Sequence, residues 1–262
     1  MTLFKNGCVI QTLDEWRDLA GPKSLTHWKP GRSAMEVARA WLGVASPALP
    51  VEVAAVLSSN PAFGGIVSWN AEPEVRLPFD QYRGEPRNTD LLVQARDDYG
   101  DFLLAVEAKG DEPFGETVAQ ALAAAAERKR VNPRSRGIER IEQLIAALCG
   151  SEDTSRISLN QLRYQLLTAT AGAIAEAVRN QRQRTVLLIQ EFHTDQTSDA
   201  KHLANERDLN TFINQLSRGA ISQIESGTIH GPFKIAEGPL FGKAPPFFIG
   251  KATRNIRAVQ SL

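Results

Sequence analysis

The sequence predicts an α/β (α+β) fold with a mixed central sheet flanked by helices, in a single domain over residues 1–262. Helix and strand patterns follow one another in the order helix, three strands, helices, strand, helix, and no linker divides them. The composition, 42% hydrophobic and 23% charged, is typical of a globular chain that buries a sizeable core.

The charge balance and the cysteines limit the classes of protein to which the chain can belong. Lys+Arg and Asp+Glu both number 30, so the chain lacks a global positive field, and a nucleic-acid partner would have to meet a local basic patch. Cys8 and Cys149 form neither a disulfide framework nor a zinc-ligand cluster. Without a signal-like N-terminus or a bilayer-length apolar run, we expect a cytoplasmic protein that contacts no membrane.

Helix signals come first and strand signals follow. Ser33 as N-cap and Glu36 as its capping-box partner open a helix. Residues 51–57 form a second helix that ends at an Asn-Pro turn. Strand patterns then cover residues 65–77, 90–96 and 102–109. The last two strands form a hairpin, because residues 97–101 supply acidic and glycine turn chemistry.

After residue 110 the pattern turns helical. Helices are predicted over residues 115–130, 138–148, 159–178 and 206–216. The apolar run at residues 185–189 predicts a buried central strand. Residues 228–256 indicate one or two strands with irregular connections.

The hairpin brings three charged residues together. Glu107 and Lys109 are two positions apart on one strand, so they share a face. With a turn at residues 99–100, Asp90 lies opposite Lys109 and diagonal to Glu107. With a turn at residues 98–99, Asp90 lies directly opposite Glu107. Both registers gather the same three groups.

The other face of the hairpin carries only apolar side chains: Leu91, Val93, Ala95, Phe102, Leu104, Val106 and Ala108. That face is therefore the core side. A slip of one residue would bury the charged groups against the core, so the hydrophobic pattern fixes the register that assembles them.

Two carboxylates and a strand carbonyl form a hard-oxygen site suited to Mg²⁺ or Mn²⁺. Such an ion polarises a phosphodiester and lowers the pKa of a bound water, and a neighbouring lysine orients that water or neutralises developing charge. The alternative is a solvated ion pair at the end of a hairpin. The apolar run into Glu107 and the polar exit at residues 110–115 favour the metal site.

Asp90 at the start of one strand, followed by Glu107-x-Lys109 on the next, resembles the signature of the PD-(D/E)XK nuclease superfamily. Three further stretches resemble sequences shared by a family of uncharacterised bacterial proteins in that superfamily: residues 28–33, 106–115 and 163–167. The proline that gives the superfamily its name is replaced by Thr89, a departure that many relatives share.

The resemblance implies a restriction-endonuclease-like core over about residues 32–192, with helical additions and a C-terminal extension over residues 193–262. It implies a Mg²⁺ site, in which Mn²⁺ can substitute, with the ligands Asp90, Glu107 and the Ala108 carbonyl. Lys109 would serve the attacking water. Because duplex cutters of this fold are often dimers, a homodimer is a candidate assembly.

Two residues are candidates to support the site. Many superfamily members carry a polar residue on a later helix, and Gln165 matches it. This part-buried amide needs partners, which are either the site carboxylates or a neighbouring backbone group. An acid from the first helix is also frequent. Glu36 is that candidate, although its capping box favours a structural role, and Glu74 and Glu85 are weaker ones.

The densest basic stretch consists of Arg128, Lys129, Arg130, Arg134, Arg136 and Arg140, and its first five residues are candidate nucleic-acid contacts. Its alternative is a solvated helix end with cationic groups near the C-terminus. Three histidines are scattered without metal-ligand spacing: His27, His202 and His230. His193 follows a strand and is either an accessory group of the site or a loop histidine, and the loop position is favoured.

These patterns predict a metal-dependent nuclease that hydrolyses phosphodiester bonds, in DNA by preference, with metal-activated water. One alternative is a catalytically inactive relative of the fold that binds nucleic acid or protein, which the neutral net charge favours. A second is a structural protein whose acids form surface ion pairs.

Overall fold

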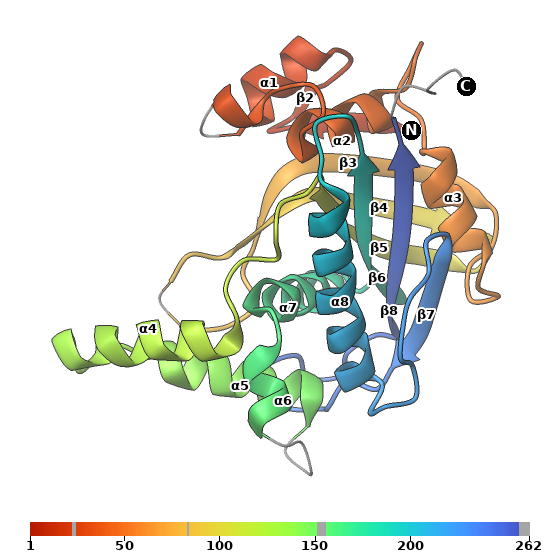
Figure 1. Ribbon diagram of the computed structural model, residues 1–262. Coiled ribbons are helices and arrows are strands. Elements are labelled where there is room, and N and C mark those ends of the chain that lie inside the picture. The colour runs from red at the N-terminus through yellow and green to blue at the C-terminus, as the bar shows by residue number, and fades with distance from the viewer. Residues whose placement is uncertain (23–24, 83, 151–155, 257–262) are drawn as a thin grey trace.

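The computed structural model describes residues 1–22, 25–82, 84–150 and 156–256. Within them, one eight-stranded sheet has the order β2-β1-β3-β4-β5-β6-β8-β7 (Figure 1). Its strands are β1 (Thr2–Lys5), β2 (Cys8–Val9), β3 (Ile66–Leu77), β4 (Arg87–Asp97), β5 (Gly100–Lys109), β6 (Arg184–His193), β7 (Thr228–Phe233) and β8 (Phe247–Asn255). The pairs β1–β3, β5–β6 and β6–β8 are parallel and the others antiparallel, which confirms the predicted mixed sheet.

Helices cover both faces of this sheet (Figure 1). The helical segments are α1 (Leu13–Ala20), the 3-10 turn η1 (Leu25–His27), α2 (Ser33–Leu42), α3 (Val51–Ser58), α4 (Val118–Val131), α5 (Gly137–Cys149), α6 (Arg156–Gln161), α7 (Tyr164–Arg179) and α8 (Asp199–Leu216). The sheet therefore has a hydrophobic core on each face. The first core lies between the sheet and α1, α2 and α3, and the second core lies between the sheet and α7 and α8. No described helix is long and apolar enough to cross a membrane.

The hairpin of β4 and β5 is buried on both faces. The apolar side predicted from the sequence packs under α1, α2 and α3. On the other face, Leu92, Leu103 and Ala105 pack against Ala173 and Ala177 of α7. The hairpin is therefore a central part of the sheet, and charged side chains at its open end lie next to the second core.

Strand β3 changes the face that it presents at Glu74. Ala71 packs under the N-terminal helices, whereas Leu77, an even number of residues away, packs under α7. Glu74 adopts φ +52°, which interrupts the alternation of side chains. Leu77 pairs with Arg87, and both approach Gly172 of α7: a Cβ there would lie 3.2 Å from Leu77 and 3.5 Å from Arg87.

The predicted helix over residues 159–178 is wrong in its continuity, since it consists of α6 and α7. Arg163 between them is extended (φ −78°, ψ 121°) and forms a β-bridge with Thr117. Backbone bonds on both sides hold this bridge: Val118 N–H donates to Leu162 O (2.8 Å), and Tyr164 N–H donates to Glu116 O (3.0 Å). The interruption makes α7 begin at Tyr164.

Two further boundaries differ from the prediction. Strand β6 continues to His193, so this histidine ends a strand and does not lie in a loop. Helix α8 begins at Asp199, earlier than the predicted residue 206. The C-terminal segment contributes β7 and β8, as predicted, and β8 lies between β6 and β7 in the sheet.

Candidate functional site

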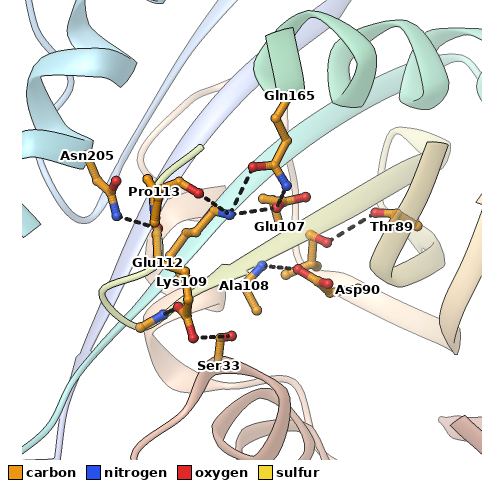
Figure 2. A network of polar contacts seen from close by, with 12 residues as sticks. Ser33, Thr89, Asp90, Glu107, Ala108, Lys109, Glu112, Pro113, Gln165 and Asn205 are labelled. Atoms are coloured by element: carbon orange, nitrogen blue, oxygen red, sulfur yellow. Dashed lines mark hydrogen bonds and ion pairs between the residues drawn. The ribbon is translucent and has the colours of Figure 1, made fainter. Parts of the chain in front are cut away.

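The hairpin adopts the register with its turn at residues 98–99. Leu91 pairs with Val106, and Asp97 pairs with Gly100. Continuing that register by one residue places Asp90 opposite Glu107. The Asp90 carboxylate accepts a 2.7 Å hydrogen bond from the Ala108 backbone N–H (Figure 2).

Glu107 is the centre of a buried polar network (Figure 2). Its Oε1 accepts a hydrogen bond from Gln165 Nε2 (2.7 Å) and lies 3.1 Å from Lys109 Nζ. Its Oε2 forms an ion pair with Arg87. Lys109 Nζ also donates to Gln165 Oε1 (3.1 Å) and to Pro113 O (3.5 Å). The structure thus brings together Asp90, Glu107, Lys109 and Gln165.

Gln165 reaches this network because of the interruption between α6 and α7. It is the second residue of α7, so its side chain projects from the first turn toward the end of β5 (Figure 2). The sequence left two kinds of partner for this amide, a site carboxylate or a backbone group, and the structure shows the carboxylate of Glu107.

The electrostatics of the two carboxylates differ. Burial and the neighbouring Glu107 carboxylate raise the pKa of Asp90 to about 8. Burial also acts to raise the pKa of Glu107, but the cationic Arg87 and Lys109 hold it below its ordinary value. Burial raises the pKa of Glu74, whose carboxylate is bound by Asn88. The site therefore holds one carboxylate matched by cations and one without a matched charge.

A shallow, open cavity of about 470 Å³ lies beside the network. Its lining residues are Arg87, Lys109, Pro113, Gly115, Glu116, Tyr164, Gln165 and Thr168. A larger groove of about 1530 Å³ shares Glu116 and Tyr164 with it, so the two hollows adjoin.

Five arginines line the larger groove: Arg128, Arg134, Arg136, Arg140 and Arg179. Four of them, all except Arg179, belong to the predicted basic stretch. Lys129 and Arg130 do not line the groove; Lys129 binds Glu139 (2.8 Å) and Arg130 binds Glu127 (2.7 Å). The sequence did not indicate Arg179, which is the last residue of α7.

The capping box predicted for Ser33 and Glu36 is wrong. Arg32 is the N-cap residue and makes no side-chain capping bond, and Ser33 Oγ donates to Glu112 (3.1 Å). Glu36 instead accepts from the Gly31 backbone N–H (2.7 Å), which lies outside the helix, and from Arg39 (2.8 Å). These bonds, the ones described for Glu36, do not reach the network around Glu107.

The two weaker acidic candidates have different positions. Glu74 lies close enough to Asp90 for its charge to affect the pKa of Asp90. Glu85 is exposed, and its backbone oxygen accepts from Arg140 (3.3 Å). Glu74 is therefore the better placed of the two.

Sequence reasoning missed Arg87. Regular alternation along β4 would direct it away from Glu107, yet Arg87 binds Glu107, and its cross-strand partner Leu77 lies beyond the change of face at Glu74. The sequence signal for Arg87 was a cation three positions before Asp90, and such a signal alone does not predict a contact with Glu107.

The histidine prediction is also wrong, because Glu191, His193 and His202 form a group that could hold a metal ion. One ligand atom from each residue lies within 4.8 Å of the others. Glu191 and His193 are two apart on β6 and share a face, and the next helix supplies His202. Strand alternation was the signal that could have paired the first two.

One protein-family model matches residues 9–244. The chain belongs to this family, the domain of unknown function DUF6946. The match to DUF6946 includes the residues of both clusters described above. No curated protein and no solved structure matches the chain. The DUF6946 description names no activity, so function is inferred from the geometry of the site.

Proposed function

We propose that the chain is a metal-dependent nuclease that hydrolyses phosphodiester bonds, with DNA as the preferred substrate. The observation that carries the proposal is the convergence of Asp90, Glu107 and Lys109 at the end of the hairpin, beside a cavity. Gln165 supports them from α7.

The donor set fits a hard divalent cation. Asp90 and Glu107 lie close enough for the charge of Glu107 to raise the pKa of Asp90, and a cation between two carboxylates relieves such repulsion. Asp90, Glu107 and the Ala108 carbonyl would hold Mg²⁺, with Mn²⁺ as a substitute. When bound, the ion would polarise the phosphodiester and acidify a coordinated water.

The residues of the chain supply the rest of the chemistry. Lys109 Nζ is fixed by Glu107, Gln165 and Pro113 O, and it lines the cavity. From there it hydrogen-bonds the attacking water and offsets negative charge that develops on the phosphate. Water attacks phosphorus in line, the bond to the leaving oxygen breaks, and one proton is released.

Arg87 has a second part in this proposal. Its guanidinium binds Glu107 and also lines the cavity. An arginine in that position can donate a charge-assisted hydrogen bond to a substrate phosphate. Beyond the cavity, the groove arginines, among them Arg128 and Arg134, continue the positive surface along which a nucleic-acid backbone would lie. We place the enzyme in the cytoplasm. We also propose that it is a homodimer, an assembly that would suit a duplex substrate.

Plasmid nicking tests the proposal. Supercoiled DNA is incubated with the full chain and Mg²⁺ or Mn²⁺, alongside Lys109→Ala and Asp90→Ala. We expect nicking by the wild type, a fall of about 100-fold or more for each variant, and none with EDTA. Glu142→Ala is the matched control, because Glu142 is an exposed acid on α5, away from the network. Equal nicking by wild type and Asp90→Ala would refute the proposal.

One observation favours the alternative of a non-catalytic binding module. Both oxygens of Glu107 already have partners, in Arg87, Lys109 and Gln165. A carboxylate matched in this way is stable without a metal ion. DNA binding without cleavage, at any Mg²⁺ or Mn²⁺ concentration, would establish the binding module in place of the nuclease.

A further inference from the structure

A second group of metal-ligating side chains lies where β6 ends and α8 begins. Glu191 and His193 close β6, and His202 is the fourth residue of α8. Glu191 and His202 are buried, and His193 is partly exposed. The imidazoles of His193 and His202 stack with their centroids 3.8 Å apart.

The carboxylate of Glu191, a member of this group, has one unsatisfied oxygen. The side chain is only 3% exposed, and its Oε1 has no hydrogen-bond partner among the residues that the structure describes. Its Oε2 makes two long contacts, with Lys251 Nζ (3.4 Å) and His193 Nε2 (3.7 Å). Buried carboxylate oxygens normally have partners, since leaving one without costs about 1–3 kcal/mol or more. Such an oxygen is a built-in acceptor for a ligand.

We infer that Glu191, His193 and His202 form a zinc site. Two imidazoles and one carboxylate are a known three-ligand set for Zn²⁺, and imidazole ligands select Zn²⁺ over Mg²⁺. The atoms lie within 4.8 Å of one another, which a small side-chain movement closes to the spacing around one ion. Three protein ligands leave a fourth position for water, typical of zinc sites that act on a substrate.

The stacked rings define the movement that binding requires. Nearly parallel imidazoles, with 19° between their planes, direct their lone pairs side by side and not toward one point. One ring must therefore turn about its Cβ–Cγ bond. His193 is the ring free to do so, because it is the more exposed of the two.

Lys251 is the counter-charge against which the ion competes. Its ammonium lies 3.4 Å from Glu191 and 3.9 Å from Glu206, which is 41% exposed. A bound cation would replace the lysine at Glu191, and Lys251 would keep Glu206 as a partner. Removing this charge with Lys251→Met is therefore expected to tighten Zn²⁺ binding by about tenfold.

The zinc site lies next to the network of Glu107 but is separate from it. Lys109 pairs with Glu191 across the β5–β6 ladder, so the two clusters occupy neighbouring strands on one face. Asn205, one turn after His202, donates to Glu112 O (2.9 Å) in the loop that follows Lys109. Zinc would join α8 to the sheet at this point. The inference does not depend on the proposed nuclease activity.

Equilibrium dialysis of the metal-free full chain against Zn²⁺ tests the site. We expect one tightly bound Zn²⁺ per chain, and a loss of at least 100-fold in affinity for His202→Ala and for Glu191→Gln. His230→Ala is the matched control, since His230 lies outside the cluster. Asp90→Ala should also keep the zinc, which separates this site from the proposed magnesium site.

X-ray absorption at the zinc edge identifies the ligands in the wild-type protein, so this measurement does not require any variant to fold. The wild-type spectrum should show two imidazole ligands together with oxygen. The inference is overturned if the wild type binds no stoichiometric zinc, if His230→Ala loses it, or if the spectrum shows thiolate or fewer than two imidazoles.

Discussion

The carboxylate of Asp90 accepts a 2.7 Å hydrogen bond from the backbone N–H of Ala108, the residue between Glu107 and Lys109. This bond ties the open end of β4 to the end of β5. Asp90, near the start of β4, is thereby held beside Glu107 and Lys109 at the end of β5, and the proposed metal site depends on this arrangement.

A divalent cation should stabilise the folded chain through Asp90 and Glu107. At a Mn²⁺ concentration 100 times its Kd, the free energy of unfolding should rise by about 3 kcal/mol, which corresponds to roughly 5–10 °C in Tm. Thermal denaturation at pH 8.5, with and without Mn²⁺, measures the shift. Asp90→Ala and Glu107→Gln should lose it and Glu142→Ala should retain it; a shift of equal size in Asp90→Ala would contradict the site.

The pKa of Asp90 makes the metal-free protein less stable as pH rises. Its folded pKa, about 8, lies above the ordinary 3.8, so between these values the native state keeps a proton that the unfolded state has released. The free energy of unfolding therefore falls as pH increases from about 4 to 8. Urea denaturation from pH 5 to 9 should show this decline in the wild type and a smaller one in Asp90→Asn. Parallel profiles would show that Asp90 ionises normally.

Replacing Gln165 should weaken both the fold and the site. Gln165→Ala leaves Glu107 without an amide donor and Lys109 without an amide acceptor. We expect a loss of about 1–3 kcal/mol in stability, and a fall in nicking rate of about 10- to 100-fold. Gln161→Ala, at an exposed position on α6, is the control and should change neither. Wild-type nicking by a folded Gln165→Ala would remove Gln165 from the site.

A buried ion pair at the closed end of the hairpin should dominate its stability. Arg184 binds Asp97 through two bonds, of 2.8 and 2.7 Å, and both side chains are at most 10% exposed. Arg184→Met should cost about 3–5 kcal/mol, because it leaves a buried carboxylate unpaired. Urea denaturation should show under about 1 kcal/mol for Arg96→Met, whose pair with Asp101 is exposed. Similar losses in both variants would contradict this account.

The sequence predicted the hairpin and its charged end because one alternation of side chains accounts for both the apolar face and the charged group. Alternation placed Leu91 and Val106 on the core side, and the same alternation placed Glu107 and Lys109 together. Both possible turns gave that result, so the cluster did not depend on choosing between them. The structure adopts the turn at residues 98–99.

Features set by tertiary contacts could not be predicted. The break before α7 arises from a β-bridge between Arg163 and Thr117, which are distant in sequence. Arg87 binds Glu107 against the regular alternation of β4, at a point where the paired strand β3 has changed face at Glu74. The pairing of His193 with His202 depends on how α8 packs against the sheet. No local pattern carries this information.

Anomalous diffraction from a crystal soaked in Mn²⁺ tests the central claim most directly. We expect a manganese peak bridging the carboxylates of Asp90 and Glu107, within bonding distance of the Ala108 carbonyl, and no such peak in Asp90→Ala. A wild-type map without density between these two residues, or with manganese only at Glu191, would contradict the account.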